Sequence, residues 1–148
     1  MLARDVHGFV TKHKSIPPHV LAPLLAGGDT AFVTLQPGAQ NAPAAFGRHA
    51  PAVVDVRASL RDFADTAALI EQLDLVISAD TAVAHLAGAL GKPVWMLDRY
   101  NACWRWRIAP DASPWYPWMR IFRQTRFGDW SDVATRVAVA FADWRSGL

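Results

Sequence analysis

The segment from Asp74 to Leu97 constrains the fold more than any other part of the sequence. It reads DLVISADTAVAHLAGALGKPVWML, in which two apolar runs, 74–78 and 93–97, enclose a stretch rich in alanine and glycine. Short apolar runs without alternating polar residues are typical of strands that are buried on both faces. The stretch 81–91 between them predicts a helix. A strand, a helix and a second strand in this order form a βαβ unit, whose two strands are parallel.

The rest of the chain repeats this alternation. Further strands are expected at 30–38, 52–56 and 119–124, and further helices at 15–28, where Pro23 can cut the helix short, at 62–73, and from Asp129 onward. In the last helix one face carries Trp130, Val133, Val137, Phe141 and Trp144. The pattern predicts an α/β fold with a single Rossmann-like, doubly wound parallel sheet and helices on both faces.

Composition sets the broad class. The chain has 148 residues, of which 52% are hydrophobic, so one compact domain over 1–148 is expected. The formal net charge is +2 with no run of like charge, which does not predict a nucleic-acid partner. The single cysteine, Cys103, excludes an internal disulfide and a cysteine metal site, and it favours the cytoplasm. No apolar run is long enough for a transmembrane segment or a signal peptide.

The start of the predicted helix 81–91 has the features of an anion site. In open parallel sheets ligands bind beyond the carboxyl ends of the strands, where Asp80 and Thr81 fall. If Asp80 is the N-cap, it accepts the amide of Val83 and leaves the amides of Thr81 and Ala82 for a phosphate. His85 follows Thr81 by one turn on the same face. The alternative interpretation is a tightly packed corner with a capping aspartate and a structural histidine.

Several separated motifs resemble one known family. The segment above, together with CWRW (103–106), SPWYPWMRIFRQ (113–124) and GDW (128–130), resembles the C-terminal domain of family-nine, heptosyltransferase-type glycosyltransferases, and most of all the branch often fused to tetratricopeptide repeats. The resemblance covers about residues 12–145. It implies half of a GT-B enzyme, in which this half binds a nucleoside-diphosphate sugar without metal or other cofactor. The other half binds the acceptor and carries the catalytic base, so no catalytic residue is assigned here.

The resemblance also implies roles for individual residues. Asp80, Thr81 and His85 correspond to the donor-site motif, and the amides of Thr81, Ala82 and Val83 would meet the diphosphate. In the heptosyltransferases proper glycine follows the Asp-Thr pair, whereas Ala82 stands here, as in the repeat-fused branch.

Asp62, Phe63 and Thr66 would lie near the nucleoside at a second turn from strand to helix. The alternative interpretation of Asp62 is another N-cap, and that of Phe63 is core packing.

Two further regions extend the predicted site. Arg105 would lie near the diphosphate, within a loop whose aromatic side chains either stack on a base or sugar or close the loop onto the sheet: Trp104, Trp106, Trp115, Tyr116 and Trp118. Near the N-terminus, which is atypical over its first 14 residues or so, Phe9 falls where the family has a lysine that contacts phosphate. Lys12 or Lys14 would take its place.

These 148 residues leave no room for an acceptor half. The first hypothesis is therefore a donor-binding domain of a glycosyltransferase, inactive alone and completed by an acceptor domain or by a tetratricopeptide-repeat chain or segment. The second is a truncated, non-catalytic domain that binds nucleotide or protein. An exposed half-cleft lined with apolar residues would also favour a homo-oligomer. A third hypothesis, a single-stranded nucleic-acid platform on the tryptophan–arginine loop, lacks a wider positive surface.

Overall fold

The structure is a computed structural model that describes residues 16–26, 30–35, 53–106 and 111–147. Lys12 and Lys14, two of the predicted phosphate ligands, lie outside the described residues. Every strand pair is parallel, as predicted. The strands are β1 (Phe32–Thr34), β2 (Val53–Asp55), β3 (Val76–Ala79), β4 (Val94–Asp98) and β5 (Met119–Arg123).

The described strands form two hydrogen-bonded groups. One contains β1 and β2, and the other has the order β3-β4-β5. In the larger group Val76 pairs with Val94, which pairs with Met119, so the three strands start in register and their carboxyl ends lie at the same edge. The Cα partners at that edge of β4 and β5 are Asp98 and Arg123. This edge is where the predicted anion site belongs.

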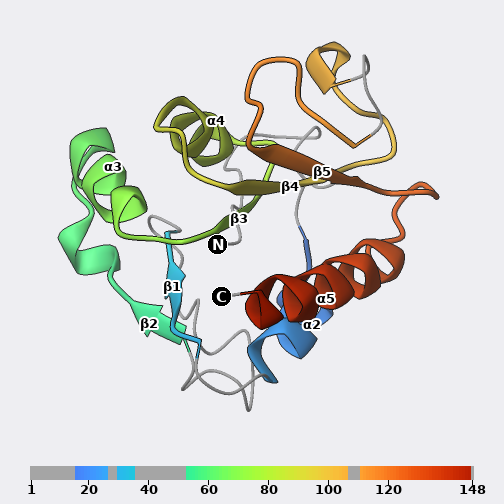
Figure 1. Ribbon diagram of the computed structural model, residues 1–148, viewed down its shortest axis with the longest axis horizontal. Coiled ribbons are helices and arrows are strands. Elements are labelled where there is room, and N and C mark those ends of the chain that lie inside the picture. Colours follow the sequence, from blue (N-terminus) through green and yellow to red (C-terminus); the bar gives the residue numbers. More distant parts are fainter. Residues whose placement is uncertain (1–15, 27–29, 36–52, 107–110, 148) are drawn as a thin grey trace.

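Helices cover both faces of the larger sheet, with α4 on one side and α5 with α2 on the other (Figure 1). The helices are α2 (Pro18–Leu21), α3 (Phe63–Glu71), α4 (Ala82–Ala89) and α5 (Ser131–Ser146), and short 3₁₀ turns occupy Ala22–Ala26, Arg57–Ser59 and Trp104–Trp106. The arrangement confirms the predicted Rossmann-like α/β class. In the described part of the chain no helix is long and apolar enough to cross a membrane.

The helix predicted for 15–28 is divided. Its α-helical part ends at Leu21, and a 3₁₀ turn from Ala22 to Ala26 continues it. Pro23 has no amide hydrogen to bond the preceding turn, so it ends the α-helix early, as its position predicted.

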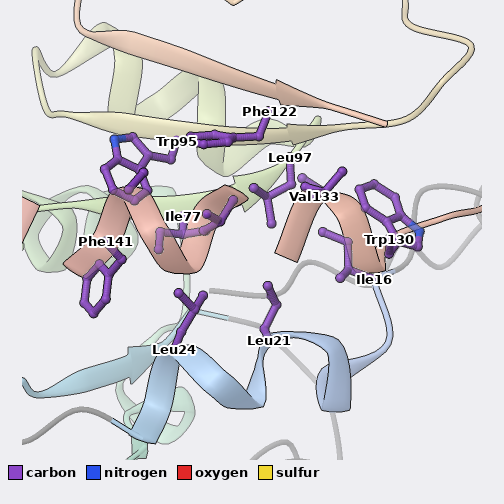
Figure 2. Packing of buried hydrophobic residues seen from close by; sticks show 13 residues of the cluster. Ile16, Leu21, Leu24, Ile77, Trp95, Leu97, Phe122, Trp130, Val133 and Phe141 are labelled. Atoms are coloured by element: carbon purple, nitrogen blue, oxygen red, sulfur yellow. The ribbon is translucent and has the colours of Figure 1, made fainter. Parts of the chain in front are cut away.

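The face of the sheet under α5 is packed with large apolar side chains (Figure 2). From the sheet come Ile77, Trp95, Leu97 and Phe122, from α5 Val133, Val137 and Phe141, and from the N-terminal segment Ile16, Leu21 and Leu24. The predicted apolar face of α5 is confirmed, with Trp144 half-buried and stacked on Phe141 at 6.0 Å between ring centroids. Phe32 of β1 reaches the same cluster through Phe141, at 5.7 Å.

The opposite face of the sheet is covered by α4, with Ile70 of α3 and a buried tryptophan from the loop beyond β4. The sheet residues here are Val76, Val94, Met96, Met119 and Ile121, which alternate along their strands with those under α5. The small side chains of Ala84 and Ala87 let α4 lie close to the sheet. Trp106, fully buried, fills the space beside the helix near its start.

Candidate functional site

The start of α4 differs in one respect from the expectation. The N-cap is Thr81, with an extended backbone at φ −140°, and not Asp80, which comes one residue earlier. The Thr81 side chain makes no capping hydrogen bond, because its hydroxyl lies 3.1 Å from the Ser78 hydroxyl oxygen. Ser78 in turn donates its own proton to the Ala79 carbonyl at 3.0 Å, so Thr81 is the donor in the pair. Both hydroxyls are thereby turned toward the end of β3.

The first amides of α4 are consequently open. The amide of Ala84 donates to the Thr81 carbonyl at 3.0 Å, but the amides of Ala82 and Val83 have no acceptor among the residues that the structure describes. The first amides of a helix lack partners within that helix and form its positive pole. Ala82 is exposed and Val83 is buried in the core, so Val83 can offer a ligand only its backbone. The arrangement suits a phosphate group.

The carboxylate of Asp80 is held by the loop beyond β4. The indole Nε1 of Trp106 donates to Asp80 Oδ1 at 3.1 Å, and Asp80 is buried. The same oxygen lies 3.8 Å from His85 Nε2. The Asp80 carboxylate therefore faces His85, which lies one turn into α4. The first residues of α4 lie beside Asp80.

His85 is fixed from two sides by aromatic residues. Its Nδ1 lies 3.1 Å from the Tyr116 hydroxyl, and its ring lies 5.3 Å from the Trp106 ring at an angle of 32°. The side chain remains 35% exposed. Thr81 and His85 lie one turn apart at the start of α4. The contact of His85 with a phosphate or sugar oxygen stays a prediction.

A second buried carboxylate lies at the same edge of the sheet. Asp98, at the end of β4, accepts a hydrogen bond from Arg123 Nε at 3.1 Å, and Arg123 Nη2 also donates to the Trp106 carbonyl. Burial raises the pKa of Asp98 above its ordinary value, and the hydrogen bond and charge of Arg123 oppose that rise. Its second oxygen, Oδ1, is buried without a partner in the described part of the chain.

The second predicted site is a helix start of a different kind. Asp62 is the N-cap of α3, and its Oδ1 accepts the amide of Asp65 at 2.9 Å, so the capping interpretation is confirmed for this residue. Thr66 donates its hydroxyl to the Asp62 carbonyl at 2.9 Å. Phe63 is 64% exposed, so the core-packing interpretation is wrong for it. An exposed aromatic ring at this helix start fits the prediction of a nucleoside contact but does not test it.

Some rings of the aromatic loop anchor it to the domain and others are exposed, so its closure onto the domain is confirmed and the stacking of a base or sugar stays a prediction. Trp106 is buried and Tyr116 is half-buried against α4, whereas Trp104 is 69% exposed. Arg105 lies between exposed rings: its Cζ is 5.9 Å from the centroid of the Trp104 ring, and its carbonyl accepts from Trp115 Nε1 at 3.3 Å. Within the described residues its guanidinium forms no hydrogen bond or ion pair with Thr81 or His85, so its predicted contact with a diphosphate stays a prediction.

Reasoning from the sequence missed Asp98 and Arg123 and underrated two aromatic residues. Asp98 comes directly after the apolar run 93–97, and Asp80 comes two residues after the end of 74–78. This shared location near the ends of parallel strands is the signal that could have revealed Asp98. Trp106 and Tyr116 were recognised only as members of the aromatic loop. No sequence spacing places them against His85.

These features together define a Rossmann-like α/β domain with polar side chains gathered at the carboxyl edge of its larger sheet. Residues 49–125 match glycosyltransferase family 9 (heptosyltransferase), and the chain belongs to this family. It is 35% identical over 135 residues to Protein FlbA of Caulobacter vibrioides, an alignment that covers 86% of this chain and 22% of that protein. The chain thus spans less than a quarter of the length of this relative. No solved structure matches the chain.

Proposed function

We propose that this chain is the domain of a family 9 glycosyltransferase that binds the nucleoside-diphosphate sugar. The observation that carries the proposal is the open start of α4, where the amides of Ala82 and Val83 lack an acceptor among the described residues and His85 lies one turn away. A helix start of this kind stabilises a diphosphate through backbone donors and the helix dipole. Family membership supplies the class of ligand.

The proposal divides the site between two helix starts. The diphosphate would meet the amides of Thr81, Ala82 and Val83, with His85 donating to a phosphate or sugar oxygen. The nucleoside would lie toward Asp62, Phe63 and Thr66 at the start of α3, where Phe63 offers an exposed ring. α3 and α4 are in contact with each other. Lys12, Lys14 and Arg105 would add positive charge around the phosphates.

Glycosyl transfer in the proposal needs an acceptor half in addition to this donor-binding domain. Placement in the branch that is fused to tetratricopeptide repeats is supported by Ala82, which replaces the usual glycine. The much greater length of Protein FlbA is in keeping with a domain that works within a larger protein. A cytoplasmic location is part of the same proposal, supported by the single cysteine.

Calorimetric titration with ADP-, UDP- and GDP-sugars tests the binding function. We expect the folded chain to bind at least one of these classes, and Thr81→Val and His85→Gln to weaken that binding. Thr135→Val provides a matched control, because Thr135 is exposed on α5, across the sheet from α4, and donates only to the Ser131 carbonyl of its own helix. Absence of binding to all three classes by a folded sample would contradict the proposal.

A second candidate is a domain that binds a protein partner without catalysing transfer. Large aromatic side chains remain on the surface of the 99–118 loop, with Trp104 69% and Trp118 45% exposed. Exposed tryptophans are enriched where proteins associate. Light scattering and a pull-down address this candidate. A monomer that binds a nucleotide sugar and captures no partner would exclude it.

A further inference from the structure

Asp80 lies near enough to α4 in sequence for its own carboxylate to accept the first amides of the helix. Aspartate side chains commonly accept amides two or three residues ahead of them, and for Asp80 these are the amides of Ala82 and Val83. Such a bond would occupy the donors that a diphosphate needs, and it would place a negative charge beside the ligand. The Asp80 carboxylate lies instead against the Trp106 indole and His85.

Trp106 is held firmly enough to impose this orientation. Its side chain is fully buried, and its carbonyl accepts from Arg123, which is itself paired with Asp98. Asp98 is only 1% exposed, so the pair is anchored inside the sheet edge. The indole N–H is therefore presented to Asp80 from a position set by the strands. A donor fixed in this way favours one orientation of the neighbouring carboxylate.

We propose that Trp106 is a positioning residue whose indole N–H draws the Asp80 carboxylate away from the first amides of α4 and so keeps them open for an anion. The inference rests on the proposed function for its purpose, because open amides matter only if a phosphate binds there. The orientation of the Asp80 side chain, which the inference predicts, can be tested without any ligand.

The test is hydrogen exchange of the Ala82 and Val83 amides, followed by NMR in the full chain. Trp106→Phe removes the N–H and keeps an aromatic ring. We expect exchange at Val83 or Ala82 to become about fivefold slower, the size of effect that a new capping bond produces. Adding Asp80→Ala to this variant should restore the original rate, because the capping carboxylate is then absent. Trp115→Phe is the matched control, since it removes an indole hydrogen bond to the Arg105 carbonyl in the same loop and should leave both amides unchanged.

Two outcomes would overturn the inference. One is a Trp106→Phe variant in which both amides exchange as in the parent. The other is a slowing that Asp80→Ala does not reverse, because general loosening or rearrangement would persist without the carboxylate. If Trp106→Phe does not fold, Asp80→Ala alone decides: it should leave exchange at Val83 unchanged, and faster exchange would show that Asp80 caps the helix in solution.

Titration with inorganic pyrophosphate separates this inference from the proposed function. We expect the parent chain and Thr135→Val to bind it alike, and Trp106→Phe to bind it several-fold more weakly. If pyrophosphate and the nucleotide sugars all fail to bind while the exchange pattern is as expected, the proposed function is wrong and the role of Trp106 toward Asp80 stands. If the parent binds pyrophosphate but the amides do not show the expected exchange pattern, the proposed function stands and the role of Trp106 toward Asp80 is wrong.

Discussion

The ring of Tyr116 lies so close to Gly88 that a Cβ at residue 88 would sit 2.7 Å from the ring carbon Cγ. Trp118 reinforces the same contact by donating its indole N–H to the Gly88 carbonyl at 2.7 Å. Gly88, near the C-terminal end of α4, is thus the place where the aromatic loop packs on the helix. Because the Tyr116 hydroxyl also meets His85, the position of the loop and the orientation of the histidine depend on each other.

Gly88→Ala should destabilise the protein although alanine is the better helix former. The ring of Tyr116 must move to admit the methyl group, and overpacking of this kind costs about 1–3 kcal/mol, more than the ~1 kcal/mol that helix propensity returns. Chemical denaturation measures the change. Gly147→Ala is the control, since a Cβ there meets only ordinary contacts at 3.7 Å. Equal stability of the two variants would show that the loop yields easily.

Asp62→Ala should lower the free energy of unfolding by about 1 kcal/mol, because it removes the side chain that caps α3. Asp62→Ser restores a capping oxygen and should recover most of the loss. Urea denaturation of both variants provides the measurement. If the alanine variant proved as stable as the serine variant, the hydrogen bond to the Asp65 amide would contribute nothing in solution.

Phe63→Ala should leave stability within about 0.5 kcal/mol of the parent, because the ring is mostly exposed. If the nucleoside stacks on this ring, affinity for the nucleotide sugar should fall by roughly tenfold, in line with the ~1–3 kcal/mol of a stacked base. Calorimetry measures the affinity. Phe127→Ala, which removes another ring that is 60% exposed, is the control. Unchanged affinity in Phe63→Ala would place the nucleoside elsewhere.

Asp98 should make the folded protein less stable as the pH rises. Burial raises the pKa of Asp98 above 3.8 in the folded state, so the unfolded chain releases this proton at lower pH than the folded protein does. Stability that depends on the protonated form is complete below the unfolded pKa and is lost as pH rises through the folded pKa. We expect the stability of the parent relative to Asp98→Asn to decline as pH increases from 3.8, as measured by thermal unfolding across pH.

The contribution of Asp132 to stability should change with pH in the opposite direction. Its hydrogen bond with Arg136, at 2.7 Å, lowers the pKa of Asp132 below the ordinary 3.8. The contribution of Asp132 is therefore present above the unfolded pKa and is lost as pH falls through the folded pKa. The pair is partly exposed, so the difference between the parent and Asp132→Asn should be small and should shrink in high salt. A difference that grows on acidification would contradict the assignment.

The strands of the larger sheet could be predicted from the sequence because their burial leaves little choice. The apolar runs 74–78 and 93–97 and the predicted strand 119–124 became β3, β4 and β5, with ends that shift by at most two residues. Strands covered on both faces need continuous apolar residues, and few other structures use them at this length. β1, with three residues, is shorter than the predicted strand 30–38, and the described strands form two groups where one sheet was expected.

Only the parts of the site that are formed by residues close together in sequence could be predicted. Asp80, Thr81 and His85 were found because a strand end and the following helix turn bring them together within six residues. The partner of Asp80 could not be found in this way, since Trp106 lies 26 residues further along the chain. Its position depends on how the loop lies over α4. The capping of α3 by Asp62 was predictable, because that hydrogen bond spans only three residues.

The crossover between β4 and β5 has a consequence for the order of folding. Two parallel strands are usually joined by a helix, which can begin to form from local contacts alone. Here residues 99–118 make the connection, and in their described part the regular structure is a single 3₁₀ turn, Trp104–Trp106. Their anchoring contacts, those of Trp106 with Asp80 and of Tyr116 and Trp118 with Gly88, all require α4 to be in place. We therefore expect the unit β3-α4-β4 to form first and the loop, and then β5, to pack onto it afterwards.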